Sequence, residues 1–311
     1  MNFLEKSIES FLTHCKVEKN LSPKSIDAYR IDLYQYCSFL KKKDLQNGEI
    51  DVGKDGVRSW LKTLSDELKP SSQKRKVATL KIFFSYLEQE ELIESNPMRL
   101  LKIRIKIPQT LPNYLSLEEM RKILACSYAC LSNLVENSSE KYRLTLRDVA
   151  VIEMLFATGI RVSELCSIKP EDIDLIKGII LIRGKGSKER YIYLGHDKAM
   201  KIITRYERSF FREIAISRSF FVNRLGNPLQ PPSVRMLIRK YAGLAKIAKN
   251  VTPHTFRHTF ATLLMDEGVD IKYIQKFLGH SSIVTTQIYT HVSQKKVEEI
   301  LVTRHPRRKI L

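Results

Sequence analysis

The sequence predicts a mainly helical protein of two domains, the second of which also carries a small antiparallel sheet. Three observations predict this. Over the first hundred residues, apolar side chains recur three and four positions apart, which is the period of helices with one buried face. A basic, proline-containing segment, 99–114, then interrupts the helical pattern. Beyond it, two short apolar runs flank a glycine-bounded turn, as expected of a β-hairpin.

Four helices are expected in the first domain, which we place at residues 1–105. The second starts at Ser22-Pro23, because serine caps a helix and proline fits its first turn. The third ends before Lys69-Pro70, and the fourth starts at the following serine pair. The expected ranges begin at residue 3 for the first helix, and are 22–40, 57–68 and 71–90 for the others.

The fourth of these helices has two different faces. Apolar side chains from Val77 to Leu87 face inward, and we place four cations on the opposite face: Lys74, Arg75, Lys76 and Lys81. Most helices expose such charges only to water. Here several of them follow a serine-rich helix start, where backbone amides also favour phosphate. We predict that these four side chains contact a nucleic-acid backbone.

A linker is expected at residues 106–115. Pro108 and Pro112 forbid one continuous helix there, and the one-signed charge of the segment suits a path along a nucleic-acid backbone. Ser116 followed by Glu119 predicts a capping box, so the second domain is placed at 116–311. Within it, residues 127–143 contain a polar, turn-rich stretch that we expect to be a surface excursion between helices.

The expected hairpin consists of strands at 179–183 and 190–194 around Gly184-Lys185-Gly186. Lys185 then lies near the tip, where a long cationic side chain can enter a nucleic-acid groove. An ordinary solvent-facing lysine is the alternative if this residue is considered alone. A third strand is expected around 220–223.

Two later helices carry further candidates. Thr252-Pro253 predicts the start of a helix whose first turn holds His254 and Arg257. Residues three apart share a helix face, so both can address one anion.

The helix that follows is capped by Asp270 and ends at Leu278-Gly279, a glycine C-cap. His280 therefore emerges directly from a helix end. Tyr289 is expected on a short helix that follows Ser281-Ser282.

The charge of the chain narrows its partners. The formal net charge is +19, from 53 Lys and Arg against 34 Asp and Glu. Such an excess is typical of nucleic-acid binding, although a basic surface tuned only for solubility is the alternative. The apolar run 149–160 contains Glu153 and is too short to span a bilayer. The five cysteines form no CxxC pair, and their odd number fits reduced thiols. We expect a cytoplasmic protein with no membrane partner.

Six residues form a set suited to one reaction: Arg161, Lys185, His254, Arg257, His280 and Tyr289. Each alone would more often be structural. Together they supply a nucleophile for a phosphodiester, cations for the charge that develops, and groups that move protons. No carboxylate cluster suggests magnesium and no P-loop pattern is present, so we expect neither a metal nor another cofactor.

The motifs that carry these residues resemble those of the tyrosine recombinase (phage-integrase-like) family, most closely its Xer-type members. They are RDVAVIEMLFATGIRVSEL (147–165), GKGSKER (184–190), TPHTFRHTFAT (252–262) and LGHSSIVTTQIYTHV (278–292). Residues 21–40 are similar to the family's N-terminal DNA-clamping domain, which has a SAM-like helical fold. The tail His305–Arg307 is similar to Xer-type ends.

This resemblance implies a role for each of the six. Tyr289 is the nucleophile and forms a 3′-phosphotyrosyl bond with DNA. Arg161 and Arg257 hold the non-bridging oxygens, and Lys185 donates a proton to the 5′ oxygen. His254 and His280 assist proton transfer, and either could be the base.

The resemblance also implies partners: double-stranded DNA with paired half-sites, and a homo- or hetero-tetramer that could include a second recombinase. A C-terminal exchange helix, Val297–Leu301, would dock into a neighbouring protomer, or alternatively onto its own domain. Chromosome-dimer resolution is the expected role, favoured by the chain's length and the lack of an extra N-terminal arm-binding domain. The alternatives are integration or excision of a mobile element, a type IB topoisomerase, and a non-catalytic DNA-binding regulator.

Overall fold

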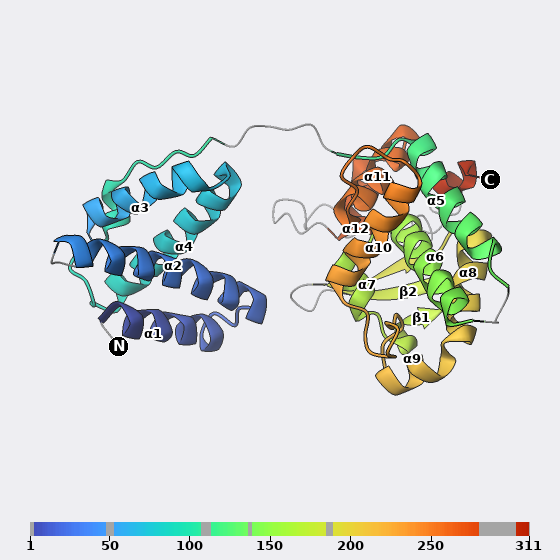
Figure 1. The fold of residues 1–311 in the computed structure, drawn as a ribbon, viewed down its shortest axis with the longest axis horizontal. Coiled ribbons are helices and arrows are strands. Elements are labelled where there is room, and N and C mark those ends of the chain that lie inside the picture. Colours follow the sequence, from blue (N-terminus) through green and yellow to red (C-terminus); the bar gives the residue numbers. More distant parts are fainter. Residues whose placement is uncertain are drawn as a thin grey trace. The chain divides into compact units, whose positions relative to one another are not determined.

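The computed structural model describes residues 3–47, 53–106, 113–135, 139–184, 189–279 and 303–310. The chain divides into two compact units, residues 1–110 (unit 1) and 111–311 (unit 2) (Figure 1). The division lies inside the basic segment 99–114. Each unit has a hydrophobic core of its own.

Unit 1 contains the four expected helices, which the structure confirms with small shifts of their ends. They are α1 (Phe3–Val17), α2 (Pro23–Asn47), α3 (Lys54–Glu67) and α4 (Pro70–Gln89), followed by a 3₁₀ turn, η1 (Pro97–Leu100). Helix α4 contacts each of the other three. Its apolar side chains, with Phe83 and Phe84 at the centre, are buried among residues such as Leu33 and Trp60.

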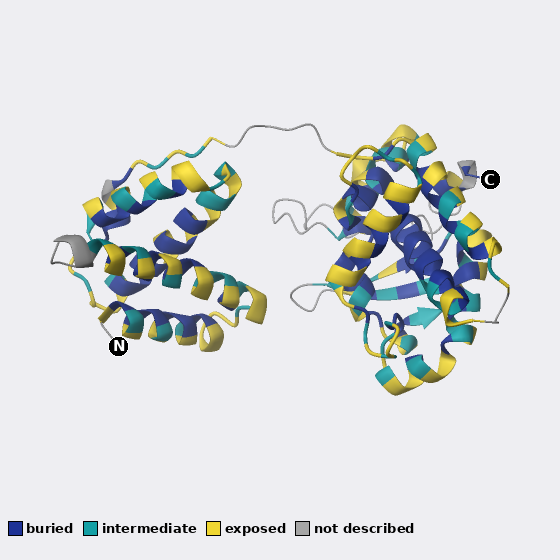
Figure 2. Ribbon diagram, in the orientation of Figure 1, coloured by how far each residue is buried: buried dark blue, intermediate teal, exposed yellow. Residues whose placement is uncertain are grey.

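Unit 2 is helical around one buried helix. Its helices are α5 (Leu117–Ser132), α6 (Glu140–Thr158), α7 (Val162–Ser167), α8 (Asp197–Ser209), α9 (Phe211–Ser217), α10 (Pro231–Leu244), α11 (Pro253–Asp266) and α12 (Ile271–Leu278), with 3₁₀ turns η2 (Pro170–Asp172) and η4 (Pro306–Lys309). Helix α6 is buried along its whole C-terminal half (Figure 2). It packs against α5, α8 and α11, and is therefore the scaffold on which the other helices are placed.

The sheet of unit 2 has three antiparallel strands in the order β1 (Ile173–Asp174), β2 (Ile179–Arg183) and β3 (Glu189–Tyr193). The predicted hairpin is β2–β3, with Ile182 opposite Arg190. Strand β1 was not predicted, since two residues carry no alternating pattern.

The predicted third strand around 220–223 is wrong. The segment makes only one isolated bridge, Val222 to Pro228. Phe221 and Asn223 exchange backbone hydrogen bonds with Leu229 and Asn227, but the alternate groups are bound by Tyr206. The Tyr206 hydroxyl donates to the Phe220 carbonyl at 3.0 Å and accepts from the Val222 amide at 3.0 Å. A side chain thus satisfies polar groups that a strand partner would otherwise bind.

The expectation of a surface excursion at 127–143 is also wrong over most of that range. Helix α5 continues to Ser132, and α6 already starts at Glu140. The reason is that Tyr128, within α5, faces the interior and donates a hydrogen bond of 2.7 Å to Glu153. The predicted capping box of Ser116 and Glu119 is confirmed at the start of α5.

Residues 303–310 are anchored to α6. Glu153, the charge inside the apolar run, is fully buried and forms an ion pair with Arg307 at 2.8 Å. His305 is also buried: its Nδ1 accepts from the Arg307 amide at 2.9 Å, so Nε2 carries the hydrogen and donates to the Ala157 carbonyl at 2.8 Å. Across the described ranges, no helix is both long and apolar enough to cross a membrane.

Candidate active site

Arg161 is placed by the sharp end of α6. Gly159 ends this helix in the left-handed conformation, with φ of 60°. A Cβ atom at this position would lie 2.5 Å from the Phe260 ring, so only glycine fits. Two residues later Arg161 is the N-cap of α7, and its amide donates to the Glu164 carboxylate at 2.9 Å.

The Arg161 side chain lies between α7 and the C-terminal end of α12. Its Nη1 donates to Glu164 Oε1 at 2.9 Å, and its Nη2 donates to the Gly279 carbonyl at 3.3 Å. The side chain is still 38% exposed. A guanidinium has five N–H groups, so donors remain for an anion approaching from solvent.

Arg257 is the fifth residue of α11, just beyond its first turn, and the predicted N-cap of this helix, Thr252, is confirmed. The guanidinium is buried and donates to the Gly159 carbonyl at 3.0 Å and to the Leu278 carbonyl at 2.5 Å. Burial, and then the charge of Arg161, lower the pKa of Arg257 to about 10. Arg257 therefore stays protonated at neutral pH, and it faces the same helix end as Arg161.

His254 lies three residues before Arg257 on α11 and is exposed. Desolvation, and then the nearby charges of His258 and Arg257, lower the pKa of His254 below its usual value. The imidazole is therefore mostly neutral at pH 7, with a nitrogen available to accept a proton.

Two further residues join this site and were missed from the sequence. Glu164 is buried and binds both Arg161 and Arg190. Burial alone would raise the pKa of Glu164, but hydrogen bonds from Arg190 and from the Arg161 amide hold it below its usual value. The spacing of three between Arg161 and Glu164 was a usable signal, because a glutamate at the third position of a helix can accept from the amide of the N-cap residue. Arg190 is the last residue of the hairpin motif GKGSKER, but the sequence alone assigned it no role.

The structure brings Arg161 and Arg257 together at the end of α12, and His254 lies near enough for the charges of both to lower its pKa. The other three predicted residues, Lys185, His280 and Tyr289, lie outside the described residues, as does the predicted exchange helix Val297–Leu301. The predicted glycine C-cap at Gly279, directly before His280, is confirmed. Among the described residues, no three His, Cys, Asp or Glu side chains converge as metal ligands would.

The four cations predicted to contact nucleic acid lie on α4 of unit 1. Lys74, Arg75 and Lys81 are exposed, whereas placing Lys76 on the exposed face was wrong. Lys76 is only 5% exposed, and its ammonium binds Asp32 at 2.8 Å. Asp32 is buried on α2, and a buried carboxylate needs a counter-charge, which draws Lys76 inward. Arg75 also binds Asp32, from the exposed side.

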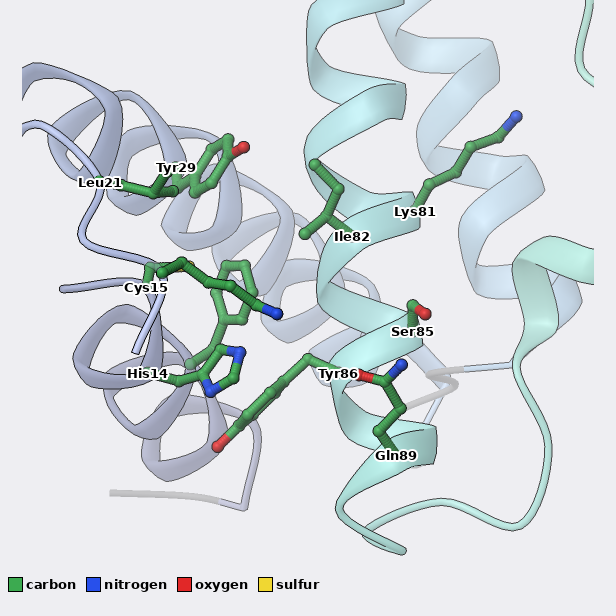
Figure 3. A pocket seen from close by; sticks show the side chains of 11 residues that line it. His14, Cys15, Leu21, Tyr29, Lys81, Ile82, Ser85, Tyr86 and Gln89 are labelled. Atoms are coloured by element: carbon green, nitrogen blue, oxygen red, sulfur yellow. The ribbon is translucent and has the colours of Figure 1, made fainter. Parts of the chain in front are cut away.

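A hollow of about 520 Å³ lies between α1 and α4 of unit 1 (Figure 3). Its wall includes His14, Tyr29 and Tyr86. Lys81, on the rim, points away from His14 and Tyr86 in this view. The Lys81 ammonium is therefore directed away from the hollow.

Comparisons with known proteins indicate one family for both units of the chain. A family model described as "Phage integrase, N-terminal SAM-like domain" matches residues 8–91, and one described as "Phage integrase family" matches residues 128–296. A "Tyrosine recombinase" from Agathobacter rectalis is 42% identical over 308 residues, covering 99% of each chain. A "Tyrosine recombinase XerC" from Oceanobacillus iheyensis is 36% identical, covering 99% of this chain and 98% of that one.

Two solved structures share the fold. XerH site-specific recombinase bound to its difH substrate has a TM-score of 0.66 at 24% identity, covering 94% of this chain and 82% of that one. A lambda integrase tetramer bound to a Holliday junction has a TM-score of 0.64 at 18% identity, covering 90% and 74%.

Proposed function

This chain belongs to the phage integrase family and is a tyrosine recombinase, and from that premise we propose that it cuts and rejoins DNA through Tyr289 to resolve chromosome dimers. The observation that carries the proposed chemistry is the meeting of Arg161 and Arg257 at one helix end. Both guanidinium groups are held by backbone carbonyls of Leu278 or Gly279, directly before the motif that contains His280 and Tyr289.

The two arginines suit a phosphodiester whose charge grows during reaction. In the pentavalent transition state, negative charge develops on the non-bridging oxygens. Cations already fixed in place stabilise that charge without reorganising at the moment of reaction. Arg257 is fixed by burial, and Arg161 by Glu164 while remaining partly exposed. We therefore assign Arg257 as the buried, fixed cation of the anion-binding site and Arg161 as its solvent-accessible cation.

The bond changes balance without a cofactor. The Tyr289 oxygen forms a bond to phosphorus as the bond from phosphorus to the 5′ oxygen breaks. The phenolic proton passes to His254 or His280, and Lys185 gives a proton to the departing 5′ oxygen. A 5′ hydroxyl from another strand then attacks the phosphotyrosine and restores Tyr289. One phosphodiester is exchanged for another, so no ATP is consumed.

DNA contacts in unit 1 are proposed for Lys74 and Lys81, whose side chains are exposed on one helix. Arg75 could contribute through N–H groups beyond its bond to Asp32. These contacts would be to phosphates, which position a protein without reading sequence. The net charge of +19 supports this interaction.

The substrate is proposed to be double-stranded DNA with paired half-sites, occupied by a tetramer that could include a second recombinase. The XerH complex with difH and the lambda integrase tetramer on a Holliday junction support this, since both share the fold. A DNA substrate also favours action in the cytoplasm. The XerC and XerD names of several relatives favour dimer resolution over mobile-element integration, which is the second candidate.

Covalent capture from genomic DNA tests this proposal. The protein is incubated with fragmented DNA of its source organism, denatured, and the DNA that remains attached is sequenced. One chromosomal locus with two inverted half-sites is expected. Sites at the ends of a mobile element would favour the integrase, and unselective capture with relaxation of plasmid DNA would favour a topoisomerase. Binding without any covalent capture would contradict the enzymatic proposal.

A further inference from the structure

Arg190 connects three elements that build the candidate active site. It lies on β3, opposite Ile182 of β2. Its Nε donates to the Phe277 carbonyl of α12 at 3.0 Å. Its two Nη atoms donate to the two oxygens of Glu164, on α7, at 3.1 and 2.8 Å. All three guanidinium nitrogens are therefore used, and the side chain is only 14% exposed.

The same guanidinium lies next to Gly279, the residue that ends α12. Gly279 has φ of 63°, and a Cβ atom added there would lie 2.9 Å from Arg190 Nη1. The Arg190 guanidinium thus occupies the space that a side chain at position 279 would need. Arg161 binds the carbonyl of this same residue and shares Glu164 Oε1 with Arg190.

These contacts make the position of Arg161 depend on Arg190. Glu164 accepts from both guanidinium groups, so without Arg190 its carboxylate would be held only by the amide and the guanidinium of Arg161, and not from the hairpin. The α12 end that Arg161 also contacts would lose the bond at Phe277. A displacement of about 1 Å in a catalytic group can cost on the order of a hundredfold in rate.

We propose that Arg190 is a positioning residue that sets Arg161 and the C-terminal end of α12 for phosphodiester cleavage. This inference rests on the proposed function, because it assigns to Arg161 the non-bridging oxygens of the scissile phosphate. Arg190 itself acts through Glu164 and the α12 backbone. Lysine cannot replace it, since an ammonium lacks the planar fork that binds both carboxylate oxygens and a third acceptor at once.

The test compares Arg190→Gln and Arg190→Lys with Arg183→Gln. Arg183 lies on the same hairpin, but its ion pairs are with Asp172 and Glu189, and neither of these residues belongs to α7 or α12. The substrate is a nicked suicide duplex carrying the captured site. Cleavage is measured at saturating DNA, and DNA affinity and thermal unfolding are measured in parallel.

Both Arg190 variants should cleave about a hundredfold more slowly than the wild type, with DNA affinity within about threefold. The Arg183 variant should match the wild type. A second substrate carries a neutral methylphosphonate at the scissile position. It lacks one negative charge that Arg161 would hold, so the Arg190 defect should shrink to within about fivefold there.

Removing Arg190 leaves the buried Glu164 with one of its two described guanidinium partners, Arg161, and this loss could unfold the protein. The double variant E164Q/R190Q removes both charges and should fold and show the same slow cleavage. An unchanged cleavage rate in folded Arg190 variants, an equal defect on both substrates, or unfolding of single and double variants alike would overturn the proposal. Absence of cleavage by the wild type would instead overturn the proposed function.

Discussion

His305 should make unit 2 sensitive to acid. Its ring is 1% exposed, lies against Phe156 and Phe260, and is bonded at both nitrogens. Burial, with further contributions from His196 and Arg307, lowers the pKa of His305 from 6.5 to about 4. The folded protein therefore binds a proton on this ring less readily than the unfolded chain does.

The sign and size follow from linkage. Because the folded pKa is the lower one, the stabilisation is complete above pH 6.5 and is lost as pH falls toward 4. The fall in the pKa of His305 from 6.5 to about 4 corresponds to about 3 kcal/mol in full, of which about 2 kcal/mol is lost by roughly pH 5.

The matched variant is His305→Gln, which keeps a donor and an acceptor but does not titrate. Urea unfolding is followed by far-UV ellipticity near pH 8 and near pH 5. Trp60, the only tryptophan in the sequence, follows unit 1 as an internal reference. The wild type should lose about 2 kcal/mol more than the variant between the two pH values. Equal losses in both proteins would refute the reasoning.

Three further outcomes are expected. Arg307→Ala should destabilise unit 2 by about 3–5 kcal/mol in urea unfolding, because buried Glu153 loses its counter-charge, whereas removing both charges should cost less. Lys74→Ala should weaken DNA binding and lower its salt dependence without changing the urea midpoint of unfolding, because Lys74 is exposed. Lys76→Ala should mainly lower that midpoint, because Lys76 is buried. The reverse pattern would contradict the placement of these two residues. Gly279→Ala should slow cleavage at saturating DNA, since the added methyl meets Arg190, and wild-type cleavage would oppose this.

Features set by neighbouring residues in the sequence were predictable. Capping at Ser116, Thr252 and Asp270 is confirmed, because a cap needs only a side chain and an amide two or three residues later. The C-cap at Gly279 is confirmed because it too is local: the residue ends α12 in the left-handed conformation, with φ of 63°, which glycine adopts without strain. The four helices of unit 1 followed from their apolar period.

Features set by distant pairs were not predictable. The sequence placed Lys76 on a solvent-facing side of α4, because its partner, Asp32, is on another helix. Glu153 appeared only to interrupt an apolar run, although Arg307 neutralises it from 154 residues away.

The same limit holds in the candidate site. Motifs identified Arg161 and Arg257 residue by residue. The three guanidinium groups that meet at the end of α12 could not be predicted, because that meeting depends on how α7, α11, α12 and the hairpin pack together. Arg190 was therefore present in a quoted motif without an assigned role.

Covalent capture by Tyr289 tests the central claim most directly. A suicide duplex carrying the recombination site is incubated with wild-type protein and with Tyr289→Phe, which lacks only the attacking oxygen. The wild type should form a DNA adduct that survives denaturation and is released by protease. The Phe variant should bind the duplex with unchanged affinity and form no adduct. A protease-sensitive adduct from the Phe variant would contradict the account.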